Sequence, residues 1–508
     1  MSLQSKMLNE ICRLLYRKEF RRFVSDCDVK KVQEEYLMNL LRKNADTKYG
    51  RQYHFAGIKS YEEYAGMVPI TVYEDYEPYI QSIMDGEDKV LTTEPVLLFE
   101  LTSGSSGGKK LIPYTNALKQ EFQKGIKPWL CDLYTGLQGM KNGKSYWSIT
   151  PVTSKKEYTK CGIPMGFEED AEYFGAVEQS IMRRIFAVDS SVKFSDSMET
   201  FYLKTGQKLL QCEELTLISV WNPTFLSILC DYMREHVQQV TADLDAKRRQ
   251  TVIVAIEENR FDKVFPMLKL ISCWADGSAE GYIADIKERF PGILIQPKGL
   301  LATECFVSFP LLGEAGSRLS IYSHFFEFRS LTDDTIVLAS GLKKGEYEVI
   351  VTTGGGFYRY SMGDIIEVLE VYENRPPRIR FLKRGGVTSD LFGEKLTEEF
   401  VRNACKKIGI SESFCLLSPV GKSYCMFTTA ENVTDDILDE VLRESYHYNY
   451  CRQLGQLDKA KVCRVYGEPK DAYIRRLVAD GMRIGDIKPA YLSPKKNWQD
   501  WFQMRKEK

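Results

Sequence analysis

The stretch that decides the fold is Val96-Leu-Leu-Phe-Glu-Leu-Thr-Ser-Gly-Ser-Ser-Gly-Gly-Lys-Lys-Leu-Ile-Pro-Tyr114. Its apolar start predicts a buried strand, which opens into a loop of glycines and hydroxyl residues and then into two lysines. Glycine lets a backbone turn tightly and direct several N–H groups at one anion, while hydroxyls add donors and lysine adds charge. This combination is typical of a phosphate-binding loop, so we expect the chain to bind a nucleoside triphosphate.

Two other interpretations of this loop fit less well. A flexible Gly/Ser linker has a similar composition, but a linker is not expected directly between a strand and a second apolar segment. The Walker pattern requires four residues between its first glycine and Gly-Lys-Ser/Thr, and the loop at 102–110 lacks that spacing. A standard P-loop NTPase is therefore disfavoured.

The composition is that of an ordinary globular protein. The chain has 508 residues, enough for two or three domains, with 44% hydrophobic and 27% charged residues. Its formal net charge is -1 and its Lys and Arg residues are scattered, which does not predict a nucleic-acid surface. We find neither a signal-peptide core nor the roughly 18 consecutive apolar residues of a membrane span. We therefore expect a cytoplasmic monomer without nucleic-acid or membrane partners.

Cysteine and histidine usage indicates neither a disulfide framework nor a zinc site. Thirteen cysteines occur without a Cys-x-x-Cys pair, and such an odd, irregular set predicts reduced thiols. The four histidines are far apart and lack metal-ligand spacing. His324 is either a functional residue or, as is more common, a histidine satisfied beside a core strand.

The remaining pattern predicts an α/β protein. Residues 1–45 repeat apolar side chains every three or four positions, which predicts helices. Short apolar runs at 217–221, 268–274 and 293–296 alternate with helical patterns, which predicts a mainly parallel sheet with flanking helices. Because ligands bind beyond the carboxyl ends of strands in open α/β sheets, we expect the phosphate loop and these strand ends to face one cleft.

A domain boundary is expected between residues 1–383 and 384–508. Arg384 is followed by Gly385-Gly386, a flexible pair, and new helix and strand patterns begin after it. The second segment has the size of a small α+β domain.

Two further motifs carry carboxylates. In Leu300-Leu-Ala-Thr-Glu-Cys305, the glutamate follows a strand and could hold Mg²⁺ on phosphate oxygens, although such a residue is more often at the surface or at a helix cap. In Thr352-Thr-Gly-Gly-Gly-Phe-Tyr-Arg-Tyr-Ser-Met-Gly-Asp364, the aspartate could accept both ribose hydroxyls, or it could only stabilise a turn of a β-hairpin.

Two basic residues near the chain's second half are candidates for nucleotide contacts. Arg384 could contact ribose or phosphate, or lie in a solvated hinge. Lys488, in Gly485-Asp-Ile-Lys-Pro489, could be an ordinary surface lysine, or it could move in with its domain to neutralise a reacting phosphate.

Taken in order, these motifs resemble those of the auxin-responsive acyl acid amido synthetases, a branch of the acyl-adenylate-forming (firefly luciferase-like) superfamily. The loop matches the superfamily pattern Thr-Ser-Gly-Ser/Thr-Thr-Gly-x-x-Lys, with Lys110 at the lysine position. The segments 300–305 and 357–368 match further motifs, and 389–396 is similar to the post-hinge signature of bacterial-type members. The resemblance covers nearly the whole chain.

The resemblance implies a large N-terminal domain that binds ATP and the acyl substrate, and a small mobile C-terminal lid domain. It also implies two half-reactions. A carboxylic acid first attacks ATP to give acyl-AMP and pyrophosphate, and an amine, usually an amino acid, then attacks the acyl-AMP to give an amide and AMP. The cofactors would be ATP and Mg²⁺.

The same resemblance assigns roles to individual residues. Phosphates would be held by Thr102, Ser103, Ser105, Ser106 and Lys110. Thr303 and Glu304 would lie at the α-phosphate, with Glu304 as the magnesium ligand, Asp364 would hold the ribose, and Tyr358 would lie near the adenosine. Arg384 and Lys488 would be the hinge arginine and the C-domain lysine, so that Lys488, Glu304 and Lys110 carry the catalytic charge.

Two departures from the plant pattern favour a microbial-like branch. Plant members usually have Tyr-Ala-Ser-Ser-Glu where this chain has Leu300-Leu-Ala-Thr-Glu304, so Ala302 replaces one hydroxyl. They also usually have Arg where Ser361 precedes Met-Gly-Asp.

Alternatives remain open at this stage. A ligase that passes the acyl group to coenzyme A or to a carrier thiol would share the first half-reaction, and a nucleotide-binding regulator without turnover would share the binding motifs. The acyl pocket is harder to predict: Trp221, Trp274, Phe306 and Phe309 lie near motif ends and either line it or belong to the core.

Overall fold

The computed structural model describes residues 3–103, 109–148, 157–166, 176–480 and 490–504. The chain forms two compact units. The first comprises Met1–Leu101 and Leu111–Lys383, and the second comprises Thr102–Lys110 and Arg384–Lys508. Among the helices described, none is long and apolar enough to span a bilayer.

The first unit begins with helices that pack on its core. They are α1 (Leu3–Val24), α2 (Val29–Lys43), α3 (Lys48–Gln52), α4 (Tyr61–Met67) and α5 (Tyr73–Met84). Asp28, Thr47 and Ser60 cap the starts of α2, α3 and α4, since their side chains accept backbone N–H groups of the first turn. The helices expected at 1–45 are thereby confirmed.

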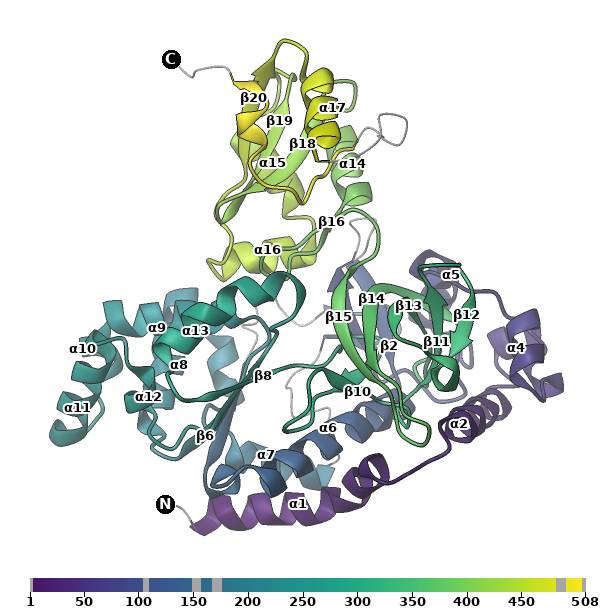
Figure 1. Ribbon diagram of the computed structural model, residues 1–508, viewed down its shortest axis with the longest axis horizontal. Helices are drawn as coiled ribbons and strands as arrows, with labels where there is room; N and C mark the ends of the chain where they lie inside the picture. The colour runs from purple at the N-terminus through teal and green to yellow at the C-terminus, as the bar shows by residue number, and fades with distance from the viewer. Residues whose placement is uncertain (1–2, 104–108, 149–156, 167–175, 481–489, 505–508) are drawn as a thin grey trace. The chain divides into compact units, whose positions relative to one another are not determined.

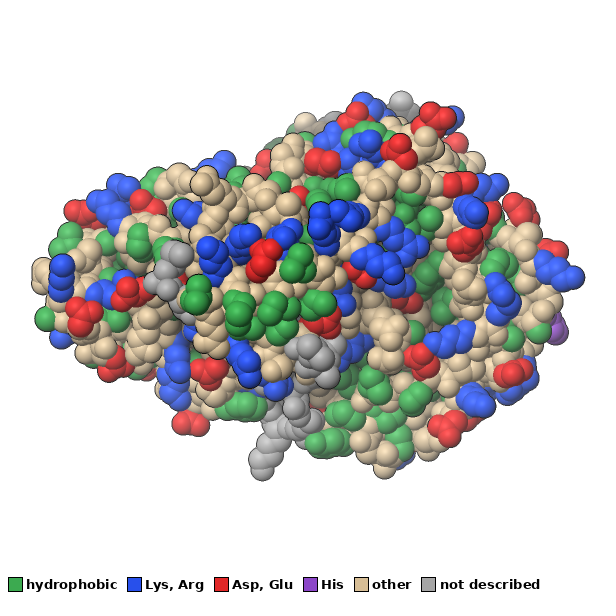
Figure 2. Space-filling view, turned by 90° about the horizontal axis from the view of Figure 1, so that it is seen from below, with side chains coloured by type: hydrophobic (Ala, Val, Ile, Leu, Met, Phe, Trp, Pro, Cys, Tyr) green, Lys and Arg blue, Asp and Glu red, His purple; other side chains and the backbone are tan. Residues whose placement is uncertain are grey.

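Helix α1 has apolar residues on two faces. Its buried side includes Leu8, Cys12, Tyr16 and Phe23. Leu3, Met7, Leu14 and Leu15 are exposed, and Figure 2 shows hydrophobic side chains gathered on the face of the molecule that contains this helix. Leu14 and Leu15 therefore fit the apolar pattern that predicts a helix, but they do not lie on the face that packs on the core.

A four-stranded parallel sheet forms one layer of the first unit, beside helices α8, α9 and α13 (Figure 1). Its strands, in spatial order, are β3 (Lys144–Trp147), β6 (Leu215–Ser219), β7 (Leu270–Cys273) and β8 (Leu294–Pro297). All its pairs are parallel. The three apolar runs expected to be strands are β6, β7 and β8, which confirms the α/β class.

Helices connect and flank these strands. They are α6 (Asn116–Gly136), α7 (Ala176–Ile185), α8 (Met198–Gln211), α9 (Pro223–Glu235), α10 (Val237–Val240), α11 (Ala246–Glu257), α12 (Phe261–Val264) and α13 (Ile283–Arg289). Asn222 caps α9 directly after β6, and Pro223 occupies its first turn. The chain thus turns into α9 shortly after the carboxyl end of β6.

The largest sheet has seven strands and antiparallel pairs, so the parallel sheet is one layer rather than the whole domain. Its spatial order is β12 (Ile336–Leu338), β11 (Phe325–Ser330), β13 (Gly345–Thr352), β14 (Tyr360–Glu370), β15 (Arg378–Arg384), β10 (Ser317–Leu319) and β9 (Ser308–Phe309). A third sheet has the order β2 (Lys109–Tyr114), β1 (Leu98–Ser103), β5 (Pro164–Met165) and β4 (Glu157–Tyr158).

The second unit is α+β, with its own core around Leu416, Phe427 and Trp498. Its main sheet has the order β18 (Cys415–Val420), β19 (Ser423–Thr428), β20 (Lys461–Tyr466) and β21 (Gln503–Met504). The other elements are β16 (Thr388–Ser389), β17 (Leu396–Thr397), α14 (Glu398–Lys407), α15 (Asp435–Leu442), α16 (Tyr446–Gln453) and α17 (Pro469–Ala479).

One cysteine pair corrects the expectation of reduced thiols throughout. Cys425 and Cys463 form a disulfide between the neighbouring strands β19 and β20. The other cysteines are free thiols, and most of them are buried. Sequence spacing did not indicate this pair because strand neighbours need not be close along the chain.

Candidate active site

The phosphate loop joins two strands, as predicted. Thr102 and Ser103 end β1, and Lys110 lies at the start of β2, where its side chain is buried. Tyr73 of α5 holds this strand start, because its hydroxyl accepts the backbone N–H of Leu111 at 2.6 Å. Ser105 and Ser106 lie outside the described residues, as does Lys488, while Arg384 ends β15.

Glu304 lies in a tight loop between β8 and β9. Ala302 and Cys305 exchange backbone hydrogen bonds of 3.0 and 3.3 Å, so Thr303 and Glu304 form the tip of the turn. The Glu304 carboxylate is buried, and Tyr360 donates its hydroxyl to it at 3.3 Å. Two predicted motifs, 300–305 and 352–364, therefore meet at this carboxylate.

Asp364 lies within β14, in a β-bulge. Ser361 pairs with Ile350 and Ile365 pairs with Glu348, so the residues between them on β14 outnumber their partners on β13. A bulge redirects side chains, and Gly363 has the positive φ of 72° that such a backbone requires. The Asp364 side chain is buried. Asp364 thus lies in a β-bulge inside strand β14, directly after Gly363, and not in the turn of a hairpin.

Tyr358 belongs to the aromatic core. Its ring stacks on Tyr49 with centroids 5.0 Å apart, and its hydroxyl donates to the carbonyl of Leu91 at 2.8 Å. The side chain is completely buried, and burial raises its pKa well above the usual value. Two positions later, Tyr360 contacts the predicted site residue Glu304.

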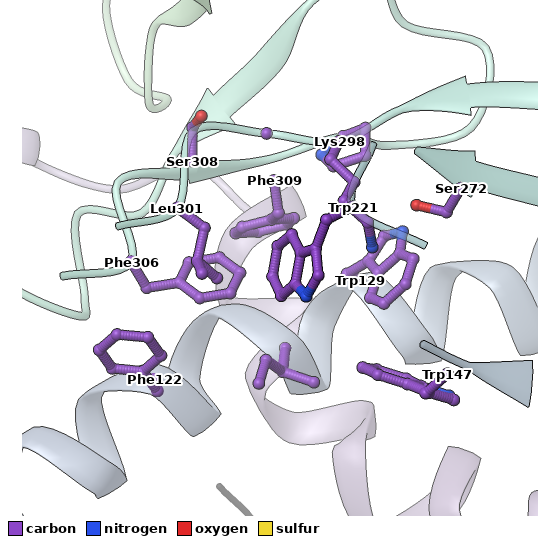
Figure 3. A pocket seen from close by; sticks show the side chains of 13 residues that line it. Phe122, Trp129, Trp147, Trp221, Ser272, Lys298, Leu301, Phe306, Ser308 and Phe309 are labelled. Carbon is purple, nitrogen blue, oxygen red and sulfur yellow. The ribbon is translucent and has the colours of Figure 1, made fainter. Parts of the chain in front are cut away.

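An apolar pocket lies against the Glu304 loop (Figure 3). Leu301 and Phe306, which flank Thr303 and Glu304, are part of its wall. The pocket's aromatic lining is Phe122 and Trp129 from α6, Trp147 from the end of β3, Trp221 after β6, and Phe306 and Phe309 on either side of the start of β9. Space lined by rings in this way is suited to a flat apolar group.

The structure shows which of the four aromatic residues proposed for the acyl pocket line this cavity. Trp221, Phe306 and Phe309 line it, whereas Trp274 does not, although its ring lies 6.0 Å from that of Trp221. Sequence reasoning missed the contribution of α6. The spacing of Phe122, Ile126 and Trp129 puts them on one helix face, and this signal could have been read from the sequence.

Lys298 places a cation in this aromatic lining. Its Nζ donates to Ser219 Oγ at 2.8 Å and lies 4.8 Å from the ring centroid of Trp221 and 5.5 Å from that of Trp129. The Trp129 ring is itself fixed in orientation, because its indole N–H donates a hydrogen bond to Gln296 Oε1 at 2.8 Å. The ammonium is therefore positioned by one hydroxyl and two indole faces.

His324 is a buried residue that contacts the pocket wall from the protein core. It is fully buried, and its Nε2 accepts the backbone N–H of Phe306 at 2.9 Å. Its Nδ1 lies 3.1 Å from Glu121 Oε2, so an accepting Nε2 implies that Nδ1 carries the proton. Glu121 also accepts the N–H of Gly354 at 2.9 Å. This buried histidine thus links the pocket wall to the glycine-rich turn through the hydrogen bond at Nε2 and the close approach of Nδ1 to Glu121, although Nδ1 makes no hydrogen bond within the described residues.

Models of known families match most of the first unit. The model described as the GH3 family N-terminal domain matches residues 17–258, and that of the GH3 family central domain matches residues 318–384. The chain belongs to the GH3 family. The N-terminal GH3 match contains the phosphate loop and Trp221, and the central match contains Asp364 and ends at Arg384; Glu304 lies between the two.

Relatives and solved structures agree with this GH3 assignment. The chain is 24% identical to the putative indole-3-acetic acid-amido synthetase GH3.10 of Oryza sativa subsp. japonica, over 79% of this chain and 87% of the relative. It is 23% identical to the jasmonoyl–L-amino acid synthetase JAR4 of Nicotiana attenuata, over 73% of this chain and 72% of the relative. Its membership makes the chain an ATP-dependent ligase of the amido synthetase type.

The fold is also similar to that of solved adenylate-forming enzymes. The AtGH3.15 acyl acid amido synthetase in complex with 2,4-DB aligns over 98% of both chains with a TM-score of 0.67 and 18% identity. A 2-hydroxyisobutyryl-CoA ligase aligns over 88% of both chains with a TM-score of 0.54 and 13% identity. The GH3 fold of this chain therefore spans both units.

Proposed function

We propose that the chain activates an aryl or similarly flat apolar carboxylic acid as its acyl-AMP and transfers the acyl group to an amino acid. The observation that carries this proposal is the contact between the aromatic pocket and the Glu304 loop. Leu301 and Phe306 line the pocket on one side and flank Thr303 and Glu304 on the other. An acyl group in the pocket would thus have its carboxylate next to the proposed α-phosphate position.

In the first half-reaction, a carboxylate oxygen of the acid bonds to the α-phosphorus, and the bond from that phosphorus to the bridging oxygen breaks. Pyrophosphate leaves with the electron pair. A carboxylate is a weak nucleophile, so the rate depends on positioning and on neutralising the phosphate charge. Lys110 and the loop at 102–110 would hold the phosphates, and Asp364 would hold the ribose.

Glu304 is the proposed magnesium ligand, and its setting suits that role. Within the described part of the chain, no three His, Cys, Asp or Glu side chains gather as they would around a protein-held metal ion. Mg²⁺ that arrives with a nucleotide is commonly bound by one or two carboxylates together with phosphate oxygens. A single buried carboxylate, oriented by Tyr360, fits that donor set. Bound there, the ion would supply charge stabilisation.

In the second half-reaction, the amine nitrogen bonds to the acyl carbon, AMP leaves, and the amine proton is released. The acyl-AMP is a reactive mixed anhydride, so water must be excluded until the amine attacks. We propose that residues 1–383 carry the ATP and acyl sites and that 384–508 act as a mobile lid, with Arg384 and Lys488 contributing to the nucleotide site. We further propose that the enzyme is a cytoplasmic monomer.

Pyrophosphate release tests this function. The assay contains ATP, Mg²⁺ and one carboxylic acid from a panel, alone, with mixed amino acids, or with coenzyme A. We expect acid-dependent release that amino acids stimulate and coenzyme A does not. Glu304→Gln and Asp364→Asn should each lower release by about 10²-fold or more, because each removes a charge aimed at the nucleotide.

The matched control is Glu373→Gln, which removes an exposed carboxylate near the end of β14 and should leave release unchanged. ATP binding without pyrophosphate release from any acid would instead indicate a nucleotide-binding regulator. Stimulation by coenzyme A alone would indicate a thioester-forming ligase.

A further inference from the structure

The aromatic pocket has two chemically different ends. At one end, Phe122, Leu301 and Phe306 are purely apolar and adjoin the Glu304 loop. At the other end, Figure 3 shows Ser272 and Lys298 near Trp129 and Trp221. The end next to Glu304 suits the start of an acyl group, so the Ser272 and Lys298 end would meet the part of the substrate farthest from the reacting carboxylate.

Ser272 provides an unsatisfied hydroxyl at this far end. The residue is in the middle of the parallel sheet, on β7, and its side chain is completely buried. Among the described residues its Oγ has no hydrogen-bond partner. In Figure 3 this oxygen points into the pocket. Buried hydroxyls are normally hydrogen-bonded, so an isolated one that faces a ligand pocket indicates a polar partner on the ligand.

Lys298 provides a positive charge at the same end. It directly follows β8, the strand beside β7, and the Ser219 hydroxyl and the two indole rings hold its ammonium at the pocket wall. A charged donor in an apolar setting forms stronger hydrogen bonds than the same group in water. Ser272 and Lys298 together form a polar end of the pocket. Ser308 also lines the pocket, but its hydroxyl already accepts the backbone N–H of Leu300 at 2.9 Å.

We propose that Ser272 and Lys298 select acyl acids that carry a second polar group at the end opposite the reacting carboxylate. The ligand class is an aromatic carboxylic acid with a hydroxyl or a second carboxylate on its ring. An acid without that group would leave the Ser272 hydroxyl buried and unsatisfied, which is the condition under which enzymes discriminate most strongly. This proposal rests on the proposed function, since it assigns specificity to the same pocket.

The test compares phenylacetate with its 3- and 4-hydroxy and 3- and 4-carboxy derivatives. Binding is measured by calorimetry without ATP, and kcat/KM is measured from pyrophosphate release. We expect at least one substituted acid to exceed phenylacetate about tenfold in both measurements. Lys298→Met and Ser272→Ala should each lower severalfold the ratio of kcat/KM for that substituted acid to kcat/KM for phenylacetate.

The control variant is Lys287→Met, which removes an exposed lysine of α13 and should preserve the ratio. An unchanged ratio in both pocket variants would overturn the proposal, as would a wild-type preference for phenylacetate. An equal loss for every acid in Lys298→Met would also overturn it, because it would place the lysine at the reacting carboxylate. Discrimination in binding without any pyrophosphate release would refute the proposed function and leave the specificity inference standing.

Discussion

At the residue scale, the site depends on buried polar groups that hold one another. Glu121 joins α6 to the N–H of Gly354, and it also accepts the hydroxyl of Tyr36. His324 adds the backbone of Phe306 to this network. None of these side chains needs to touch a substrate. Together they fix the position of the glycine-rich turn at Gly354 relative to the pocket wall at Phe306.

Replacing His324 should therefore destabilise the protein. His324→Leu keeps apolar bulk but leaves the Phe306 N–H and the Glu121 carboxylate without this partner in a buried setting, which costs about 2–4 kcal/mol of unfolding free energy. Chemical denaturation measures the change. His54→Asn, at an exposed position, is the comparison and should cost less than about 0.5 kcal/mol. A similar small loss for His324→Leu would contradict a supporting role.

At the element scale, the pocket depends on how closely α6 approaches the loop after β8. Gly125 makes this approach possible, because a Cβ at that position would lie 2.2 Å from the Phe306 ring. The glycine is in the middle of a helix, where alanine is intrinsically preferred by about 1 kcal/mol. Close packing therefore outweighs helix propensity here.

Gly125→Ala is expected to displace Phe306 and impair acid binding. The KM for the acid should rise severalfold, with little change in the KM for ATP, because the clash is at the acyl pocket. Steady-state pyrophosphate release measures both constants. Gly66→Ala in α4 is the matched control: nothing lies within 4 Å of its would-be Cβ, so it should leave both constants unchanged and stabilise the fold slightly. Equal KM values in wild type and Gly125→Ala would contradict this account.

At the scale of the whole molecule, the pocket, Glu304 and Asp364 all belong to the first unit, while Lys488 belongs to the second. A variant in the second unit should thus be able to slow acid-dependent pyrophosphate release without changing the affinity for the acid. This division follows from the proposed lid, which is needed only when charge develops on the phosphate.

Lys488→Ala should lower the rate of acid-dependent pyrophosphate release by about 10²- to 10³-fold while leaving calorimetric acid binding unchanged. Lys496→Ala removes an exposed lysine of the same unit and should affect neither quantity. Full activity of Lys488→Ala would exclude this lysine as the catalytic one.

The sequence by itself determined the expectation of nucleotide chemistry, because each motif that indicates it consists of residues close together along the chain. The loop at 102–110, the 300–305 turn and the 352–364 segment are each proposed to act through neighbouring residues, and their order along the chain indicated the GH3-type architecture. The runs that became β6, β7 and β8 were visible for the same reason, since periodicity is a property of consecutive residues.

Only the tertiary structure decided which side chains form the acyl pocket. Trp129, Trp147 and Ser272 come from three elements, α6, β3 and β7, and Lys298 directly follows β8. Each of them looks in the sequence like an ordinary core or surface residue. Likewise, only the tertiary structure shows that Tyr360, at the start of β14, reaches Glu304, because the two residues are 56 positions apart along the chain. Specificity for the acid depends on side chains that are distant in sequence and meet at one pocket. Which of them meet is decided by how the helices and strands pack and not by any local sequence pattern.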